Sequence, residues 1–178
     1  MKVLIASDIH GSAFYTEKVL ERFKAENADK LILLGDIYNH GPRNPFPKDY
    51  APQQVASLLN SVTENLIVVR GNCDSQVDTM ISDFDFTENV CILSEGKTVF
   101  CTHGHIYNKD NLPQTHYNAV VYGHFHTGFI EKVGETVVAN AGSVSLPKGG
   151  TPNSYILLSG KTVILKTIDG EVIKSQEI

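Results

Sequence analysis

Short apolar runs alternate with amphipathic stretches in the first part of the chain. Val3–Ser7, Leu31–Leu34 and Leu66–Val69 are almost continuously apolar, the pattern of strands that are covered on both faces. Between these runs, apolar residues recur at three- and four-residue spacing, first after Ser12, which is suited to cap a helix, and then after Pro52, which suits a first helical turn. We therefore predict a βαβαβ order for this part.

The pattern changes further along the chain. Tyr38–Lys48 contains three prolines, so no regular structure is expected there, and a short helix is predicted over Val77–Phe84. From about residue 90 onward, strand-like runs follow one another, some of them separated by hairpin signals. The predicted strands are Thr98–Cys101, Ala119–Tyr122, Gly128–Val133, Thr136–Ala139, Tyr155–Leu158, Thr162–Thr167 and Glu171–Lys174.

An α/β half thus precedes a β-rich half, and no linker-like stretch separates the two. The architecture that accounts for both with the fewest assumptions is α/β, with two mostly mixed sheets packed face to face and helices outside. A length of 178 residues suits a single domain, so we expect one domain over residues 1–178.

Composition limits the class of protein, its binding partners and its cellular compartment. A hydrophobic content of 42% and a charged content of 20% are ordinary for a soluble globular protein. The net charge of −5 disfavours nonspecific binding to nucleic acid or membrane surfaces, and no apolar run is long enough for a membrane span. Three cysteines without a Cys-x-x-Cys pair form neither a disulfide framework nor a zinc ribbon, so a reduced cytoplasm is expected.

Side chains suited to bind metal ions follow the ends of five predicted strands. Ligands of α/β sheets bind at the carboxyl ends of strands, and residues two apart in an extended segment point the same way. Carboxylate, amide and imidazole groups delivered to one place are what a two-metal hydrolytic centre requires. The seven candidate ligands are Asp8, His10, Asp36, Asn72, His103, His124 and His126.

Each of these motifs has a structural alternative when it is taken alone. Asp8 could cap a turn, Asn72 and Asp74 could form one, and His124 and His126 could be structural strand residues. Their combination favours a shared metal site, because unpaired polar groups at buried strand ends are costly. Of the two histidines outside the motifs, His40 is kept as a weaker candidate for a substrate contact, and His116 is weaker still.

The five motifs, in this order, resemble the signature of the calcineurin-like metallophosphoesterases over about residues 1–150. They are Asp8-Ile9-His10, Gly35-Asp36, Gly71-Asn72-Cys73-Asp74, His103-Gly104-His105 and Gly123-His124-Phe125-His126. Residues 7–11, 39–44, 70–75 and 142–150 are similar to the YfcE-type bacterial phosphodiesterases in particular. The resemblance implies an αββα sandwich.

The resemblance also implies a ligand assignment. Asp8, His10 and His126 would hold one divalent ion, Asn72, His103 and His124 would hold a second, and Asp36 would bridge the two. His105 is a rival for the position of His103, which we favour because it stands at the strand end and before a glycine. The ions of this family are often manganese, although zinc, iron and nickel also suit such ligands.

Two divalent ions carry four positive charges, and Asp8 and Asp36 neutralise two of them. The remaining two positive charges suit a bridging hydroxide together with an anionic phosphate. The expected reaction is hydrolysis of a phosphodiester by that hydroxide. Arg43, Arg70 and His40 are candidates to hold phosphate oxygens, although a surface ion pair is the plainer interpretation of either arginine.

Cys73 departs from the family pattern. Many members have histidine at this position, where it protonates the leaving group, and a thiol with a pKa near 8.5 is a poor substitute. The proton for the leaving group could instead come from Asp74, in the same motif, or from His105, in a later one. We therefore expect a preference for phosphodiesters with good leaving groups over alkyl monoesters.

Other functions fit the sequence less well. A retromer subunit uses the same fold as a protein-interaction scaffold with a decayed metal site, whereas all seven positions are filled here. The segment Gly35–Gly41 lacks the phosphoprotein phosphatase pattern. A metallo-β-lactamase needs aspartate and histidine where Gly128 and Phe129 stand here. We expect a small-molecule diester as substrate, no nucleic-acid or membrane partner and, from the resemblance, a homodimer or homotetramer. Cyclic nucleotides, lipid headgroups and nucleotide conjugates all remain open as the diester.

Overall fold

The computed structural model describes all residues, Met1–Ile178, and confirms the α/β fold class with two mixed sheets. The helices are α1 (Ala13–Ala25) and α2 (Pro52–Asn60), and two 3₁₀ turns are η1 (Thr63–Asn65) and η2 (Gln76–Met80). The strands are β1 (Lys2–Ala6), β2 (Lys30–Leu33), β3 (Leu66–Val69), β4 (Phe86–Thr87), β5 (Val90–Ser94), β6 (Lys97–Cys101), β7 (Ala119–Tyr122), β8 (Phe129–Val133), β9 (Thr136–Asn140), β10 (Ser154–Ser159), β11 (Thr162–Thr167) and β12 (Val172–Glu177).

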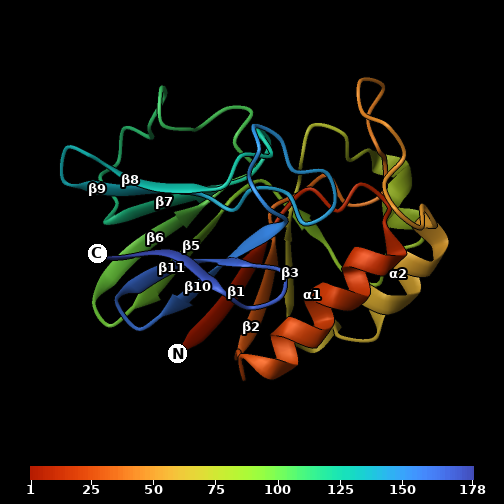
Figure 1. Cartoon of the computed structure of the whole chain (residues 1–178), viewed down its shortest axis with the longest axis horizontal. Coiled ribbons are helices and arrows are strands. Elements are labelled where there is room, and N and C mark those ends of the chain that lie inside the picture. The colour runs from red at the N-terminus through yellow and green to blue at the C-terminus, as the bar shows by residue number, and fades with distance from the viewer.

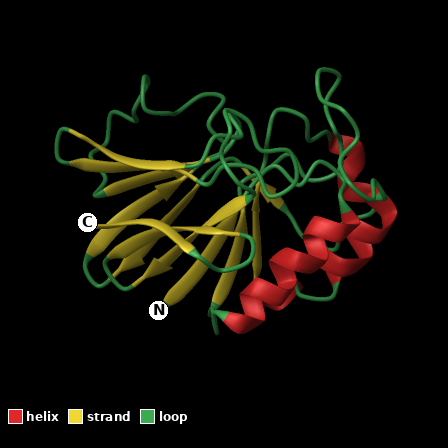
Figure 2. Ribbon diagram, in the orientation of Figure 1, coloured by secondary structure: helices red, strands yellow, loops and turns green.

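The two sheets have different strand orders. The seven-stranded sheet runs β12-β11-β10-β1-β2-β3-β4, in which β1 to β4 are parallel and β10 to β12 are antiparallel. The five-stranded sheet runs β5-β6-β7-β9-β8, with β6, β7 and β9 parallel. Both helices lie against one face of the seven-stranded sheet, at the right of Figure 1, and the sheets form the rest of the molecule (Figure 2).

Strand β1 shows why the first apolar run is continuous. Its residues alternate between the two faces of the sheet, so Leu4 and Ala6 join the cluster under the helices. Val3 and Ile5 join the cluster that lies between the two sheets. Both faces of this strand are therefore buried, and the alternating pattern of a half-exposed strand is absent.

The outer face of the five-stranded sheet is covered by a loop. Phe100, Tyr122 and Val138 are buried there against Tyr107 and Tyr117, which belong to the segment between β6 and β7. The helices outside the sandwich thus all belong to the seven-stranded sheet. No helix of the structure combines the length and apolar character that crossing a bilayer requires.

Two local predictions need correction. The helix predicted over Val77–Phe84 is wrong, because only the 3₁₀ turn η2 forms there. The Asn60 side chain donates to the Ile81 carbonyl and accepts from the Asp83 amide, which fixes this segment in a non-helical path. Strand β5 was not predicted, although Glu95 and Gly96 form a tight turn with φ of 49° and 78° that pairs it with β6.

The parallel arrangement has a consequence for function. The loops that follow β1, β2, β3, β6 and β7 gather along the upper part of the molecule in Figures 1 and 2. The carboxyl ends of the parallel strands in both sheets therefore face one region, as the sequence predicted.

Glu26, at the end of α1, anchors this helix to the sheet. Its Oε1 atom accepts hydrogen bonds from the Tyr155 hydroxyl, at 2.7 Å, and from the Lys166 ammonium group. Burial raises the pKa of Glu26, but the bonds from Lys166 and Tyr155 outweigh it and bring the pKa below its usual 4.5. The ionised carboxylate is therefore the form that stabilises the fold.

We predict that Glu26→Gln lowers the free energy of unfolding at pH 7 by about 1–3 kcal/mol, because Lys166 loses its charged partner. A depressed pKa means that this contribution is present above pH 4.5 and is lost as pH falls through the folded-state pKa. Urea denaturation of both proteins at pH 7 and pH 3.5 measures it. Glu21→Gln, at the exposed pair with Lys18, is the control and should change little. Equal effects of the two changes at pH 7 would refute the anchor.

Candidate metal centre

Five of the seven predicted ligands adopt the left-handed backbone conformation. Their φ angles are 58° at Asp8, 51° at His10, 55° at Asp36, 64° at His124 and 60° at His126. Non-glycine residues rarely adopt such angles, at a cost of order 1–3 kcal/mol each in strained cases. These turns bend the chain directly after β1, β2 and β7, and they bring the five side chains to one place.

Asp8, His10 and His126 form the first cluster of potential ligand atoms. The Nε2 atoms of the two histidines are 3.1 Å apart. Oδ1 of Asp8 lies 3.2 Å from Nε2 of His126 and 3.6 Å from Nε2 of His10. All three residues are buried, so these polar atoms face one another rather than solvent.

Asn72, His103 and His124 form the second cluster. Nε2 of His103 lies 3.0 Å from Oδ1 of Asn72 and 3.2 Å from Nδ1 of His124. His103 is fully buried, whereas Asn72 is exposed and His124 is half-buried, so this cluster opens toward solvent on one side.

Asp36 stands between the two clusters. Its Oδ2 atom lies 3.7 Å from Nε2 of His10, and its Oδ1 atom lies 3.5 Å from Nε2 of His103. One carboxylate oxygen therefore faces each cluster. The Asp36 side chain is 4% exposed, which keeps this bridge out of bulk water.

Backbone carbonyls orient three of the imidazole rings. The Nδ1 atoms of His10, His103 and His126 each lie 2.6–2.7 Å from a carbonyl oxygen. Since a carbonyl only accepts, Nδ1 must carry the proton, and the neutral ring then presents Nε2 as an acceptor. The facing Nε2 atoms of His10 and His126 are thus two acceptors in contact, which repel unless a proton or a metal cation lies between them.

The Asp8 carboxylate has an unused oxygen. Oδ2 accepts a hydrogen bond of 2.9 Å from the His124 amide, whereas the buried Oδ1 atom has no hydrogen-bond partner. Burial raises the pKa of Asp8, but the contacts with His10 and His126 outweigh it and hold the pKa well below its usual range. A buried anionic oxygen directed at two imidazoles is a suitable ligand for a divalent cation.

The residues predicted to donate a proton occupy three different environments. Cys73 lines the cavity, and burial, with the nearby Asp36 charge, raises the pKa of its thiol to about 12. Asp74 accepts from the Asp36, Ile37 and Gly71 amides through both oxygens. Burial still raises the pKa of Asp74 to about 6. Through its hydrogen bonds to these three amides, Asp74 holds the loop after β2 against the loop after β3.

His105 is exposed, and its ring centre lies 5.3 Å from that of His103 and 6.2 Å from that of His124. Burial and the neighbouring His103 lower the pKa of His105. Of the two rivals for one ligand position, the geometry favours His103, whose ring is buried and in contact with Asn72.

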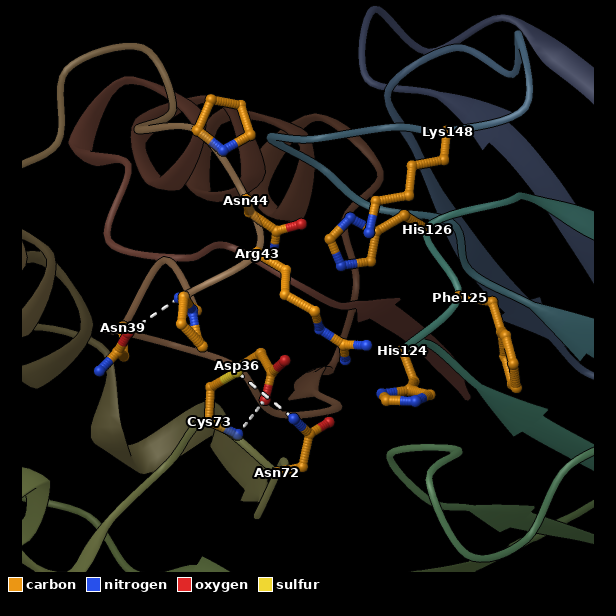
Figure 3. Close-up of a pocket in the computed structure, with 13 residues that line it drawn as sticks. Asp36, Asn39, Arg43, Asn44, Asn72, Cys73, His124, Phe125, His126 and Lys148 are labelled. Atoms are coloured by element: carbon orange, nitrogen blue, oxygen red, sulfur yellow. Dashed lines mark hydrogen bonds between the residues drawn. The ribbon is translucent and has the colours of Figure 1, made fainter.

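A cavity of about 860 Å³ opens beside the two clusters. Of the three predicted substrate contacts, Arg43 lines this cavity, and its guanidinium group points into it (Figure 3). His40 lies outside the lining, against the Phe46 ring at 4.4 Å between centres. Arg70 lies over the Phe86 ring, 5.1 Å from its centre, also outside the lining. The geometry thus favours Arg43 over the other two.

The sequence did not mark all of the lining residues as site residues, and two of those not predicted carry large side chains. Lys148 and Phe125 line the cavity, and Phe125 remains 47% exposed (Figure 3). Phe125 lies within the motif that ends at His126, which was a signal for it. Lys148 precedes two glycines in an irregular segment, where no periodic pattern marks it and only the resemblance over residues 142–150 was a signal.

Two motif glycines permit the close approach of the loops. A Cβ atom at Gly71 would overlap Oδ1 of Asp36. A Cβ atom at Gly123 would lie 2.6 Å from Oδ2 of Asp8 and would overlap the Ser7 hydroxyl. Glycine at these two points therefore lets the loops of different strands share one site.

Comparison with known proteins shows the family to which the chain belongs. The family model of the calcineurin-like phosphoesterase superfamily domain matches residues 1–162. The chain belongs to this superfamily. It is 47% identical to phosphodiesterase YfcE of Escherichia coli over 178 residues, which are 99% of this chain and 97% of that protein. It is 28% identical to the probable metallophosphoesterase YsnB of Bacillus subtilis, over 89% of this chain and 84% of that one.

Solved structures show the same architecture. The structure of YfcE, described as a phosphoesterase from Escherichia coli, matches with a TM-score of 0.95 and 45% identity over 100% of both chains. Vacuolar protein sorting 29 of Cryptosporidium parvum matches with a TM-score of 0.65 at 20% identity, over 99% and 97% of the two chains, and shares the fold alone.

Membership of a metallophosphoesterase family implies divalent metal ions, and the donor atoms of this phosphoesterase fit them. Three groups of acidic, histidine or cysteine side chains have their ligand atoms within 4.8 Å of one another, and Asp8, His10 and Asp36 each take part in two of these groups. Carboxylate oxygens and imidazole nitrogens together suit divalent ions such as manganese, iron and zinc.

We predict that Gly123→Ala destabilises this phosphoesterase by about 2–3 kcal/mol, because the added methyl group displaces Ser7 or Asp8. Gly134→Ala is the control: its φ is +62° but its Cβ would meet nothing within 4 Å, so it should cost only about 1 kcal/mol of backbone strain. Chemical denaturation of the two variants provides the comparison. Equal losses of unfolding free energy in the two variants would show that Gly123 is not in tight contact with Ser7 and Asp8.

Proposed function

We propose that the protein is a phosphodiesterase that works with two divalent metal ions. The observation that carries this proposal is the position of Asp36, whose two carboxylate oxygens face separate clusters of ligand atoms. A carboxylate in that position can bridge two cations. Family membership and 47% identity to a phosphodiesterase over nearly the whole chain support the reaction class.

The proposed ligand sets follow the two clusters. Asp8, His10 and His126 would hold one ion, and Asn72, His103 and His124 would hold the other, with Asp36 between them, because the closest ligand atoms within each set already lie 3.0–3.2 Å apart. Two bound ions would supply Lewis acidity toward the phosphate and an activated water. Manganese is our first candidate, and zinc, iron and nickel suit the same donors.

The remaining residues of the site have distinct tasks in this proposal. Arg43 points into the cavity, where its guanidinium group can hold an anionic group of the substrate beside the metal centre. The carbonyl groups that accept from His10 and His103 keep those rings oriented. Asp74 holds the Asp36 loop against the β3 loop through the Asp36 and Gly71 amides, so its carboxylate positions the bridge.

Protonation of the leaving group is the weak point of this site. The Cys73 thiol, with its pKa raised to about 12, is a poor proton donor. Both oxygens of Asp74 are engaged with backbone amides, which leaves the exposed His105 as the freest of the predicted donors. We infer that the enzyme prefers small-molecule diesters whose leaving group needs little help.

The proposal also includes the oligomeric state and the cellular compartment of the enzyme. A homo-oligomer is supported by exposed apolar side chains on two edge strands, Leu93 on β5 and Val172 and Ile173 on β12. Action in the cytoplasm is consistent with three unpaired cysteines. A catalytically idle scaffold is not favoured, since every ligand position of both clusters carries a suitable donor.

We predict that Asp36→Asn lowers the turnover of an activated aryl phosphodiester by at least about a hundredfold, because the bridge between the two ions is weakened. Asp110→Asn removes an exposed loop carboxylate and should leave turnover unchanged. The measurement is release of 4-nitrophenol from bis(4-nitrophenyl) phosphate with added Mn²⁺, after dialysis against a chelator. Full activity of a folded Asp36→Asn variant would overturn the site.

We predict that Cys73→His raises turnover of substrates with poor leaving groups, by about tenfold or more for an alkyl monoester, because an imidazole near neutrality is a better acid than this thiol. An aryl diester should change by less than about threefold. Steady-state rates on an aryl diester, an alkyl diester and an alkyl monoester test this. Equal rates on all three in the parent, and no change in the variant, would refute our account of Cys73.

A further inference from the structure

Two cations line the cavity outside the candidate metal centre. Arg43 comes from the loop after β2, and Lys148 comes from the segment between β9 and β10. Neither side chain takes part in an ion pair or a hydrogen bond within the protein. Both are drawn in Figure 3, where the two side chains reach toward the same hollow from different segments.

The backbone fixes both cations relative to the ligand clusters. The Lys148 amide donates a hydrogen bond of 2.8 Å to the carbonyl oxygen of His126. In the loop that carries Arg43, the Asn39 carbonyl accepts from Nδ1 of His10 at 2.7 Å. Both side chains are exposed, and these backbone contacts place the two segments that carry them beside the candidate ligands His10 and His126.

The charge of the cavity is unbalanced. Asp36 is the single acidic residue among those that line it, and its two oxygens face the ligand clusters. The outer wall therefore carries two positive charges and no negative one, in a chain whose net charge is −5. Two unpaired cations converging on one cavity are a suitable site for an anion.

A simple phosphodiester does not use these charges. In the proposed centre, two divalent ions with Asp8 and Asp36 leave two positive charges, which one attacking hydroxide and a singly charged diester neutralise. Arg43 and Lys148 then remain in excess. A substrate that matches the whole cavity needs a further negative group beyond the reacting phosphate.

We propose that Arg43 and Lys148 form a subsite for a second oxyanion, and that the preferred substrate is a phosphodiester bearing a carboxylate or phosphate-type group on the alcohol that is retained. This inference rests on the proposed phosphodiesterase function. Because Arg43, Lys148 and Asp36 line one cavity, a single small molecule can reach the subsite and the metal centre together.

Three synthetic diesters test the subsite. All release 4-nitrophenol, and the retained alcohol is phenol, 3-carboxyphenol or 3-phosphonophenol, so the leaving group is the same throughout. We expect kcat/KM to be about tenfold higher for the charged diesters than for the phenyl diester. The larger preference of the two identifies the oxyanion. Turnover of the phenyl diester with no preference for charge would overturn the subsite alone, and absence of turnover of every diester would overturn the proposed function.

Substitutions of Arg43 and Lys148 test whether these two side chains cause the preference for charged diesters. Lys148→Met and Arg43→Met should each reduce the ratio of charged to neutral kcat/KM by about threefold, and the double variant should abolish it. Lys132→Met removes an exposed lysine of β8 outside the cavity, and it should keep the ratio. A double variant that retains the preference, or an Arg43 variant that lowers all substrates equally, would contradict the assignment.

A binding measurement separates recognition from chemistry. Calorimetric titration with phenyl phosphate and with 3-carboxyphenyl phosphate compares two product-like monoesters on the same protein. We expect about tenfold tighter binding of the carboxylated compound, and the loss of that difference in the double variant. Equal dissociation constants for the two compounds would refute the subsite whatever the turnover data show.

Discussion

Three imidazole rings of the candidate centre donate Nδ1–H to backbone carbonyls, and this one constraint decides the chemistry of the region. It turns Nε2 of each ring inward as an acceptor. The inward space is then lined mainly by acceptors, including the unpartnered Oδ1 atom of Asp8 and both oxygens of Asp36, of which only Oδ1 accepts a backbone hydrogen bond, from Cys73. Such a collection of lone pairs is electrostatically unfavourable without protons or cations, and divalent ions at two points would stabilise all of it.

The fold supports this arrangement at a cost. Strand ends of both sheets meet at one edge, where left-handed turns at Asp8, Asp36 and His124 bend the chain away from regular structure. Gly71 and Gly123 remove the side chains that would keep the loops apart. The stability needed to hold these strained turns comes from the two large apolar clusters on either side of the seven-stranded sheet. The strain therefore lies where ligand binding can offset it.

The parts of this arrangement that follow strong local patterns could be predicted from the sequence. Apolar runs at β1, β2 and β3 are continuous because both faces are buried, and the polar residues after them had to converge. Other parts depend on contacts that no local pattern shows. The 3₁₀ turn η2 replaces a helix because Asn60, distant in sequence, bonds its backbone, and Lys148 reaches the cavity only through the path of an irregular segment. The ligand roles themselves remain proposals.

The central claim is that two metal ions share the Asp36 carboxylate, and anomalous X-ray diffraction at the manganese edge tests it most directly. Crystals grown with Mn²⁺ should show two anomalous peaks about 4 Å apart, both within coordination distance of Asp36. One peak should lie among Asp8, His10 and His126, and the other among Asn72, His103 and His124. A single peak, or two peaks of which only one contacts Asp36, would contradict the account.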